Sequence, residues 1–311
     1  MKTLLKTNDL TYEEWKAARR NYGGIIRIGG SDAPTIMHVN PFACEMDLWL
    51  DKTGQFDEEL NSDAIKWGKL LEDLVAKQFA EETGLKVQRY NRILCHDTHE
   101  FMLANIDRKV VGEHTGLECK TTSAFNKWPW HGRIVPPYYY AQIQHYLAVT
   151  EWQKWWTAVL VGGQKLHVFE VYRDDDYIKE LIEKEEKFWQ LCNTMTPPEF
   201  DGSEASSNVV ANMYPKADGS VKDLPEDAFD LVRQYDEADR AEKDAKTRKD
   251  EAANKLKGLL GDAERGLIFD RTVSWTNVSS NKFDSKRFQS EKEDLYKQYV
   301  KESSYRRFQI R

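Results

Sequence analysis

The feature that most constrains the fold of this 311-residue chain is the stretch 107–120, which is predicted to form a β-hairpin. Two valines at 110–111 belong to the first arm, residues 117–120 form the second, and the glycine-containing segment 112–116 makes the turn. A hairpin here requires a sheet in the fold. It also determines which side chains share a face.

Charged side chains on this hairpin are predicted to converge on one face. Because side chains alternate along a strand, Glu118 and Lys120 point to the same side and Cys119 points away. Asp107 begins the first arm, so we expect it beside Glu118. Two carboxylates and one amine at one place can hold a divalent cation and position a water for hydrolysis.

Composition describes an ordinary globular protein with a charged surface, since 40% of the residues are hydrophobic and 31% are charged. The net charge of −7 argues mildly against a nucleic-acid partner. Positive charge is nevertheless available locally, because residues 281–311 hold nine Lys or Arg against five Asp or Glu. A basic groove on an otherwise acidic protein is therefore compatible with this composition.

Location is predicted from what the sequence does not contain. No apolar run approaches the roughly 18 residues of a membrane span, and the first residues show no apolar core of a signal peptide. The four cysteines are scattered without a C-x-x-C pair, so neither a disulfide framework nor a zinc or iron–sulfur site is indicated. We expect a cytoplasmic protein without a membrane partner.

A Gly-rich turn lies upstream of the hairpin. Helix 10–21 precedes it, and the apolar segment that ends at Gly29 and Gly30 leads into a short helix capped by Ser31 or Asp32. The main-chain N–H groups at such a helix start suit an anion, so a phosphate-binding corner is one interpretation. A plain capped turn is the other.

A strong amphipathic helix is predicted from residue 63 until Gly84. Apolar residues at helical spacing make its predicted buried face, namely Trp67, Leu71, Leu74, Val75 and Phe79. Glu72 lies beside that face, where it is either functional or a solvated helix carboxylate. Strands are predicted next at 86–87, 91–95 and 101–104.

A second helix, 138–149, follows the hairpin and begins after Pro137. It carries Gln142 and Tyr146 on one face, because they are four residues apart. The remaining core elements are predicted as two strands joined at Gly162-Gly163 and a final helix, at 155–161, 166–171 and 176–192.

Two features stay ambiguous. The Trp- and Pro-rich loop 125–137 interleaves aromatic and basic residues, which fits either a nucleic-acid clamp or packing over the core. His96, His99 and His114 have no matching Cys or His pair, so we interpret them as loop surface and not as metal ligands.

Domain organisation follows from a change of composition near residue 196. We predict a core over 1–196, a Pro- and Ser-containing linker over 197–221, and a C-terminal extension over 222–311. The extension is predicted to hold one long charged helix or a helical hairpin, then short strands, a helix at 284–301 and a basic-aromatic tail.

The motifs, taken in order, resemble a known family. Glu72, Asp107, Glu118-x-Lys120 and Gln142-x-x-x-Tyr146 resemble the core pattern of the PD-(D/E)xK nuclease superfamily, although Ile106 stands where that pattern has proline. Five segments between residues 12 and 192 resemble the YqaJ-type viral recombinase family, relatives of phage lambda exonuclease. They are Ile28-Gly-Gly-Ser-Asp-Ala-Pro, Trp67-Gly-Lys-Leu-Leu-Glu, Met102-Leu-Ala-Asn-Ile-Asp-Arg, Gly116-Leu-Glu-Cys-Lys-Thr and Pro137-Tyr-Tyr-Tyr-Ala-Gln-Ile-Gln-His-Tyr.

The resemblance implies an α/β (α+β) fold, a restriction-endonuclease-like core with a central mixed β-sheet flanked by helices. It also implies digestion of double-stranded DNA from the 5′ end with Mg²⁺, or Mn²⁺ in its place, at a two-metal site. Asp107, Glu118 and the main-chain carbonyl of Cys119 would hold one ion, and Glu72 would assist a second. Lys120 would orient or deprotonate the attacking water.

Further roles are implied in the same way. Gln142 would hold Lys120 or the water with Tyr146 in support, and Asp97 stands where the family often has another acid. Ser31 would bind the 5′-phosphate with an arginine, for which Arg19 and Arg27 are the candidates together with the neighbouring Arg20.

The resemblance also implies partners. These are double-stranded DNA ends, a single-strand annealing protein, and further copies of the chain in a ring, such as a trimer. It implies a phage or prophage protein that works in the cytoplasm of a bacterial host.

Other functions remain open at this point. The same core would serve an endonuclease or a nuclease subunit of a repair complex, although no P-loop for an ATP motor is present in the sequence. A catalytically idle protein that binds DNA ends is the alternative from a different class. The full set of Asp107, Glu118 and Lys120 argues against it.

Overall fold

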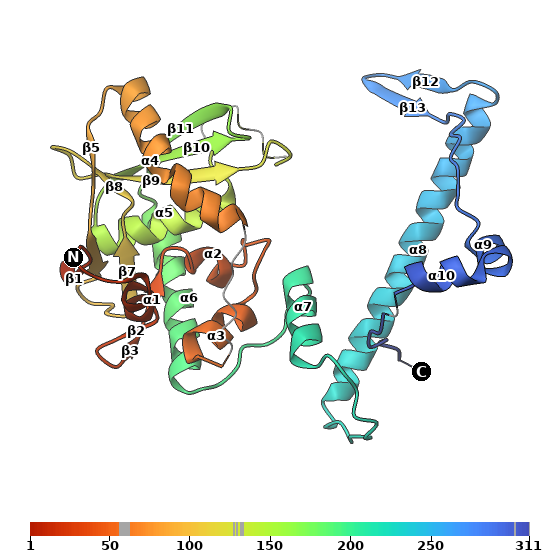
Figure 1. The fold of residues 1–311 in the computed structure, drawn as a ribbon, viewed down its shortest axis with the longest axis horizontal. Coiled ribbons are helices and arrows are strands. Elements are labelled where there is room, and N and C mark those ends of the chain that lie inside the picture. Colours follow the sequence, from red (N-terminus) through yellow and green to blue (C-terminus); the bar gives the residue numbers. More distant parts are fainter. Residues whose placement is uncertain (56–62, 127, 129, 131–133, 302, 311) are drawn as a thin grey trace. The chain divides into compact units, whose positions relative to one another are not determined.

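The computed structural model describes residues 1–55, 63–126, 128, 130, 134–301 and 303–310. The chain forms two compact units, Met1–Met213 (unit 1) and Tyr214–Arg311 (unit 2), which are described separately (Figure 1). No helix within the described ranges combines the length and the apolar character needed to cross a membrane.

A five-stranded sheet in unit 1 contains the predicted hairpin. Its order is β11-β10-β9-β8-β5, with β9 and β10 parallel and the other neighbours antiparallel. Arg108 pairs with Leu117, which confirms the hairpin. The strands are β5 (Val87–Arg89), β8 (Arg108–Val110), β9 (Gly116–Thr122), β10 (Lys154–Val161) and β11 (Lys165–Tyr172).

The predicted turn between β10 and β11 is also confirmed. Gly162 and Gly163 have φ of 59° and 68°, left-handed values, in the three-residue loop between the paired residues Val161 and Lys165. Glycine adopts these values without the steric cost that a side chain would add.

A second sheet of four strands completes the β-structure of the described part of unit 1, apart from the short hairpin β2 (Asn21–Tyr22) and β3 (Ile25–Ile26). The predicted α/β architecture with a mixed sheet flanked by helices is confirmed, and the strands of unit 1 form a second sheet in addition. The chain passes from β7 to β8 through Ile106 and Asp107 alone. The second sheet runs in the order β1 (Lys2–Lys6), β6 (Arg92–Cys95), β7 (Met102–Asn105) and β4 (Ile28–Gly29).

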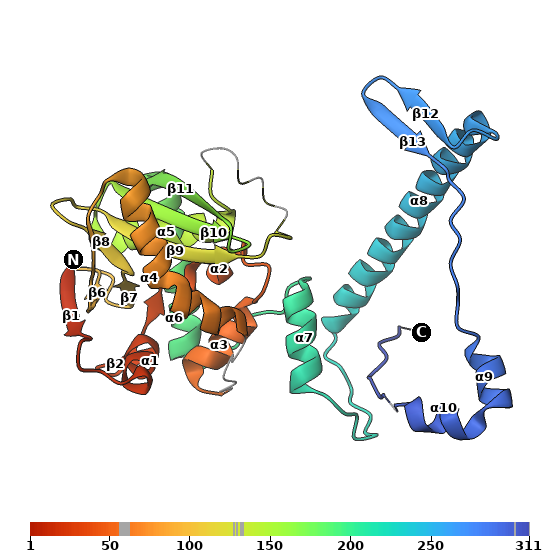
Figure 2. The same ribbon diagram turned by 45° about the horizontal axis from the view of Figure 1, so that its top comes forward.

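Helices cover both faces of the five-stranded sheet (Figure 2). Helix α4 (Asp63–Thr83) packs on one face through Val75 and Phe79, which contact Leu117 of β9. Helix α5 (Pro137–Thr150) lies on the other face and also contacts β7 of the second sheet. Residues on β9 therefore alternate between an α4 side and an α5 side.

The predicted buried face of α4 is partly wrong. Val75 and Phe79 are buried, but Trp67 and Leu74 are 57% and 54% exposed. At about 100° per residue, Leu74 lies roughly 140° around the helix from Phe79, so one packed sheet does not cover both. Glu72, seven residues before Phe79, lies within roughly 20° of it and thus on the sheet side.

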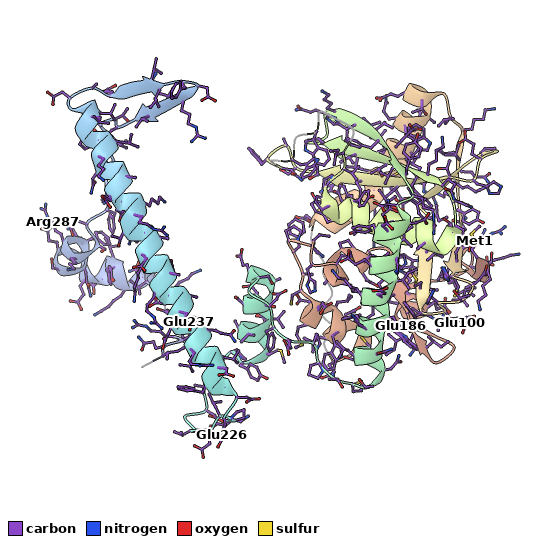
Figure 3. The ribbon with its side chains drawn as sticks, turned by 180° about the vertical axis from the view of Figure 1, so that it is seen from behind. Met1, Glu100, Glu186, Glu226, Glu237 and Arg287 are labelled. Carbon is purple, nitrogen blue, oxygen red and sulfur yellow. The ribbon has the colours of Figure 1, made fainter. Side chains whose placement is uncertain are left out.

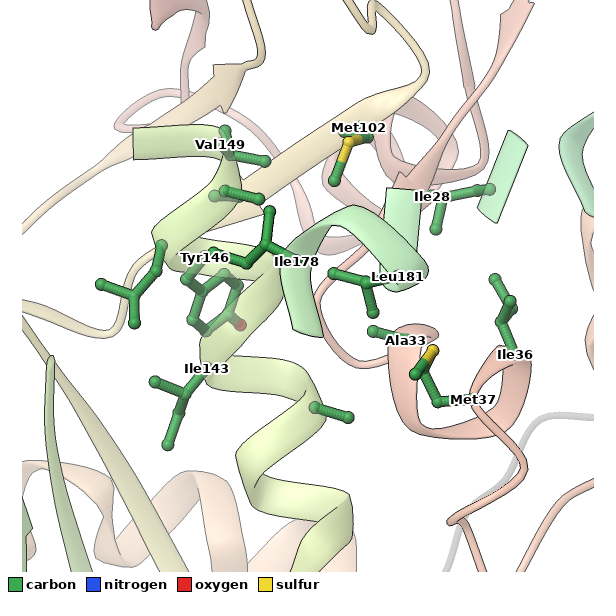
Figure 4. Packing of buried hydrophobic residues seen from close by; sticks show 14 of the residues in the cluster. Ile28, Ala33, Ile36, Met37, Met102, Ile143, Tyr146, Val149, Ile178 and Leu181 are labelled. Atoms are coloured by element: carbon green, nitrogen blue, oxygen red, sulfur yellow. The ribbon is translucent and has the colours of Figure 1, made fainter. Parts of the chain in front are cut away.

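The main core of unit 1 surrounds α5. Helices α1 (Tyr12–Arg20) and α6 (Asp175–Asn193) form where the sequence predicted helices, and the short α2 (Ala33–Ile36) follows the Gly-rich turn. Helix α3 (Glu45–Thr53) comes after α2 in the chain. The close view in Figure 4 shows part of this cluster around Tyr146, with Ile28, Ile36, Met102, Ile143 and Leu181.

The segment predicted as linker, 197–221, contains a helix. Helix α7 (Glu204–Met213) buries Ala205 and Val209 and packs on α3, so unit 1 continues to Met213. These two residues are one turn apart and supply a short apolar face within an otherwise Ser- and Asn-rich stretch.

Unit 2 is built on a single 33-residue helix, α8 (Ala228–Leu260), so the long-helix interpretation is confirmed over a helical hairpin. The predicted strands form a small hairpin, and the predicted helix 284–301 is divided at Lys292. Figure 3 shows side chains such as Glu237 and Arg287 projecting from the helices of this unit. The further elements are β12 (Arg265–Ile268), β13 (Arg271–Ser274), α9 (Ser285–Glu291) and α10 (Glu293–Tyr299).

Candidate active site

The hairpin brings its charged side chains together. Lys120 Nζ lies 2.7 Å from Glu118 Oε1, and Asp107 Oδ2 accepts a hydrogen bond of 3.0 Å from the main-chain N–H of Cys119. The side chain of Cys119 packs on the opposite face with the α4 cluster, as the alternation predicts. Asp107 reaches Glu118's neighbourhood because it lies at the crossing between the two sheets.

Helix α5 supports this site from behind. The side-chain amide of Gln142 donates to Glu118 Oε1 at 2.7 Å and to the hydroxyl of Tyr146 at 2.9 Å. One turn of helix separates the two residues, so they act from the same face. Gln142 thus holds Glu118, whereas the family resemblance implied that it would hold Lys120 or the water.

The carboxylates of the site are poorly balanced by positive charge. Both hydrogen bonds to Glu118 go to Oε1, and its buried Oε2 has no partner among the described residues. Burial and the nearby Glu118 and Glu72 raise the pKa of Asp107 well above its usual value. Burial lowers the pKa of Lys120, but the attraction of Glu118 and Asp107 outweighs it and the net shift is upward.

These donors suit a hard cation. Within the described ranges no group of three or more His, Cys, Asp or Glu side chains is arranged to hold a metal ion by itself. Mg²⁺ needs fewer, since one or two carboxylates with water usually suffice. N–H and C=O of one strand residue point the same way, so the Cys119 carbonyl faces Asp107's side. With the buried Glu118 Oε2, the set is all oxygen and fits Mg²⁺.

Glu72 has a partner that sequence reasoning missed. Arg108 Nη1 lies 2.5 Å from Glu72 Oε1 and donates to the main-chain oxygen of Asp107 at 2.6 Å, while its other nitrogen contacts Asp73. Arg108 is buried, and it joins α4 to the start of β8. A signal existed, because Arg108 lies two residues from each of the apolar Ile106 and Val110 and so shares their buried strand face, where an arginine needs acidic partners.

The predicted phosphate corner also assembles. Arg19 Nη2 lies 2.7 Å from Ser31 Oγ, and both residues flank the Gly29-Gly30 turn. A Cβ on Gly30 would lie 2.4 Å from the ring of Tyr146, so only glycine allows this approach. Arg19, Gly29, Gly30 and Tyr146 line one small cavity, which brings the corner next to α5.

Other predicted residues lie elsewhere. Arg27 is buried, and its guanidinium donates to the main-chain oxygens of Tyr22 and Glu100. Arg20 pairs with Asp51 at 2.6 Å. Asp97 is exposed and lies 2.6 Å from the amino group of Met1. In the Trp- and Pro-rich loop, residues 127, 129 and 131–133 lie outside the described residues.

A groove of about 200 Å³ opens beside the acidic cluster. Glu72, Asp107 and Arg108 line it. Its lining also includes aromatic and basic side chains, namely Trp15, Arg89, Tyr90 and Arg92. Such a lining suits the backbone and bases of a nucleic acid strand.

Comparison with known sequences identifies the family of this chain. A family model described as the YqaJ-like viral recombinase domain matches residues 14–153. The protein YqaJ of Bacillus subtilis (strain 168) is 37% identical over 314 residues, which cover 99% of this chain and 97% of that protein. The chain belongs to the YqaJ family.

Solved structures with similar folds include two exonucleases. An alkaline exonuclease from Laribacter hongkongensis aligns with a TM-score of 0.49 and 20% identity, over 65% of this chain and all of that one. A phage related exonuclease from Haemophilus somnus 129PT aligns with a TM-score of 0.41 and 13% identity, over 55% of this chain and 97% of that one.

Proposed function

We propose that this protein is a Mg²⁺-dependent 5′→3′ exonuclease that digests linear double-stranded DNA from its ends. The digestion would leave single strands for homologous recombination by annealing. The observation that carries the proposal is the convergence of Asp107, Glu118 and Lys120 around a buried carboxylate oxygen that no described residue satisfies. Membership in a family of viral recombinases supports the same function.

The acidic residues would hold the cation. Asp107, Glu118 and the Cys119 carbonyl are the proposed ligands of one Mg²⁺, for which Mn²⁺ would substitute, and Glu72 would assist a second ion. When bound, the metal supplies charge stabilisation at the scissile phosphate and the leaving 3′-oxygen. Arg108 keeps Glu72 at the edge of the groove, since the two are 2.5 Å apart.

Lys120 and Gln142 would set the geometry of attack. The ammonium of Lys120 keeps its proton while it is paired with Glu118, so we assign it to orienting the attacking water and the phosphate. Gln142 fixes the side chain of Glu118, and Tyr146 fixes Gln142. Gln142 and Tyr146 would thus support Glu118, a proposed metal ligand, and not the attacking water.

The corner formed by Arg19 and Ser31 would bind the terminal 5′-phosphate. A guanidinium and a hydroxyl 2.7 Å apart offer several donors to phosphate oxygens. Arg27 is left out of this role because its guanidinium serves two main-chain carbonyls. A phosphate held beside Tyr146 would place the first phosphodiester near Glu118.

The proposal extends to assembly and partners. A ring of several copies, such as a trimer, would enclose the duplex and keep the enzyme on its substrate. A single-strand annealing protein would receive the product strand. We propose both kinds of partner, further copies of the chain and an annealing protein, because the motifs resemble those of the family.

One assay tests the nuclease proposal. Linear duplex labelled at its 5′ ends and a circular duplex of the same sequence are incubated with Mg²⁺ and the wild-type chain. We expect the linear DNA alone to be degraded, and Lys120→Ala to lower the rate by about 10² or more, as loss of a positioned proton-transfer or orienting group does. Lys249→Ala, on the exposed surface of α8, is the matched control and should keep full activity.

The other outcomes separate the alternatives. Cutting of the circular DNA would indicate an endonuclease. Binding of linear ends without any cutting in Mg²⁺ or Mn²⁺ would indicate a non-catalytic DNA-end-binding protein.

A further inference from the structure

A buried lysine lies behind the phosphate corner and has no part in the functions described so far. Lys52, near the end of α3, places its Nζ 2.5 Å from Asp32 Oδ2, and the two side chains are 5% and 13% exposed. Lysine is rarely buried unless paired, because an ammonium loses its hydration there. The pair therefore calls for a specific use.

Asp32 does not cap its helix in the ordinary way. It stands at the N-cap position of α2, yet its side chain makes no capping hydrogen bond to the described residues of that helix. Oδ2 accepts a hydrogen bond of 2.7 Å from the main-chain N–H of Gly29, while the N–H of Asp32 donates to the Gly29 oxygen at 2.9 Å. One carboxylate oxygen thus joins the ammonium of Lys52 to the backbone of the Gly-rich turn.

The turn that this pair holds carries the phosphate corner. Ser31 lies inside it and Gly30 touches the ring of Tyr146, so a shift of the turn moves the Ser31 hydroxyl and disturbs α5. Movement is tightly limited on that side, because the interior has no free volume for even one methyl group at Gly30.

Lys52 also keeps the carboxylate of Asp32 from competing with Ser31 for the guanidinium of Arg19. The guanidinium of Arg19 and the carboxylate of Asp32 are neighbours beside Gly29. A Cβ added to Gly29 would lie 3.5 Å from Arg19 Nη2 and 3.7 Å from Asp32 Oδ2. Burial alone would raise the pKa of Asp32, but Lys52 and Arg19 hold it below its usual value and keep the group anionic. Without Lys52, this buried anion would draw Arg19 away from Ser31.

We propose that Lys52 is a positioning residue for recognition of a 5′-terminal phosphate. By neutralising Asp32, it fixes the Gly29–Ser31 turn and leaves the guanidinium of Arg19 available for the anion. The inference rests on the proposed function of the corner, and it adds a residue that never touches the DNA.

Binding tests the inference without any need for cutting. Linear duplexes with 5′-phosphate or 5′-hydroxyl ends are titrated in chelator with wild type and Lys52→Met, and the ratio of the two Kd values is measured by fluorescence anisotropy. We expect wild type to prefer the phosphate. Lys52→Met should reduce that preference about tenfold, the usual value of one charge-assisted hydrogen bond, while hydroxyl-end binding stays the same.

A second substitution separates positioning from general damage. In the double variant Asp32→Asn/Lys52→Met the uncompensated carboxylate is gone, and the new side-chain amide oxygen can still accept from the N–H of Gly29, so much of the phosphate preference should return. Lys77→Met, an exposed lysine on α4, is the control and should leave the ratio unchanged. If Lys52→Met does not fold, Lys52→Gln, which retains a hydrogen-bond donor without the charge, takes its place with the same expected direction.

The outcomes are distinct. A wild-type ratio near one, or a ratio that Lys52→Met leaves unchanged, would overturn the inference while the nuclease assay with Mg²⁺ stands on its own. Preference in binding without cleavage would instead contradict the proposed nuclease and leave the role of Lys52 supported.

Discussion

Unit 1 contains three clusters of buried apolar side chains, whereas none of the described residues of unit 2 is buried. In unit 2, Leu259 is 85% exposed and Phe269 is fully exposed, although the first lies on a regular helix. Ion pairs such as Lys243–Asp239 and Lys255–Glu251 line α8 one turn apart. Such exposed pairs contribute little to stability, because water and salt screen them.

The difference teaches what apolar periodicity indicates. In unit 1, α4 and α6 show helical spacing and bury residues such as Phe79 and Leu181 against a sheet or another helix. In unit 2, α8 shows the same spacing, and no layer among the described residues buries any of its side chains. Periodicity therefore predicts a helix in both units, but it predicts a packed interior only where other elements supply a second layer.

The largest expected effect tests this contrast directly. Phe79→Ala, at a fully buried site, should lower the free energy of unfolding by about 3–5 kcal/mol, because it leaves a cavity under α4. Leu259→Ala in α8 should change it by less than about 0.5 kcal/mol, as is usual for exposed positions. Urea denaturation of both variants measures the two values. Equal losses would show that α8 is packed in solution.

A smaller effect is expected at the active site. The pKa of Asp107 is raised in the folded chain, so ionising it costs stability. Stability from this group is complete below its unfolded pKa of about 3.9 and is lost as the pH rises through the folded value. Asp107→Asn, which removes the charge, should therefore have a higher Tm than wild type in chelator, with a gap that widens from pH 4 upward.

Thermal unfolding between pH 4 and 8 measures this gap. Asp230→Asn, on the exposed start of α8, is the control and should show no widening gap. A gap that shrinks with rising pH would show that Asp107 is stabilised as an anion. The site would then contain more positive charge than the structure assigns to it.

The smallest effect is expected from removing unit 2. Because none of its described residues is buried, deletion of 214–311 should move the Tm of unit 1 by no more than a few degrees. Nuclease activity and oligomer mass, measured on the same protein, show whether the extension contributes to the DNA track or to assembly. A large loss of Tm would mean that the two units stabilise each other.

Much of unit 1 could be predicted because its signals are local. Gly84 ends α4 with a φ of 73°, Pro137 begins α5, and Gly162 and Gly163 lie in the turn between β10 and β11. The hairpin geometry of Glu118, Cys119 and Lys120 follows from alternation alone. Each of these outcomes depends on a few consecutive residues and on the conformations they allow.

The remaining features depend on contacts between distant elements. Gln142 bonds Glu118 in preference to Lys120 because α5 approaches β9 from behind, which its helical spacing does not specify. Arg108 and Lys52 were not predicted as site residues, because their partners are distant in the sequence. The partners of Arg108 are 35 and 36 positions away, and the partner of Lys52 is 20 positions away. The division of the strands between two sheets was not predicted, because a two-residue crossing at Ile106 and Asp107 gives no loop signal.

The parallel pairing of β9 with β10 has a consequence for how a newly made chain becomes active. Arg108 and Leu117 meet across a short hairpin, but Glu118 meets Thr157 only after the chain has travelled through α5. Closing the longer loop costs more chain entropy and is slower. We therefore expect a refolding molecule to bring Asp107 and Glu118 together first and to add Gln142 when the crossover closes. The acidic pair would then form before the complete site does.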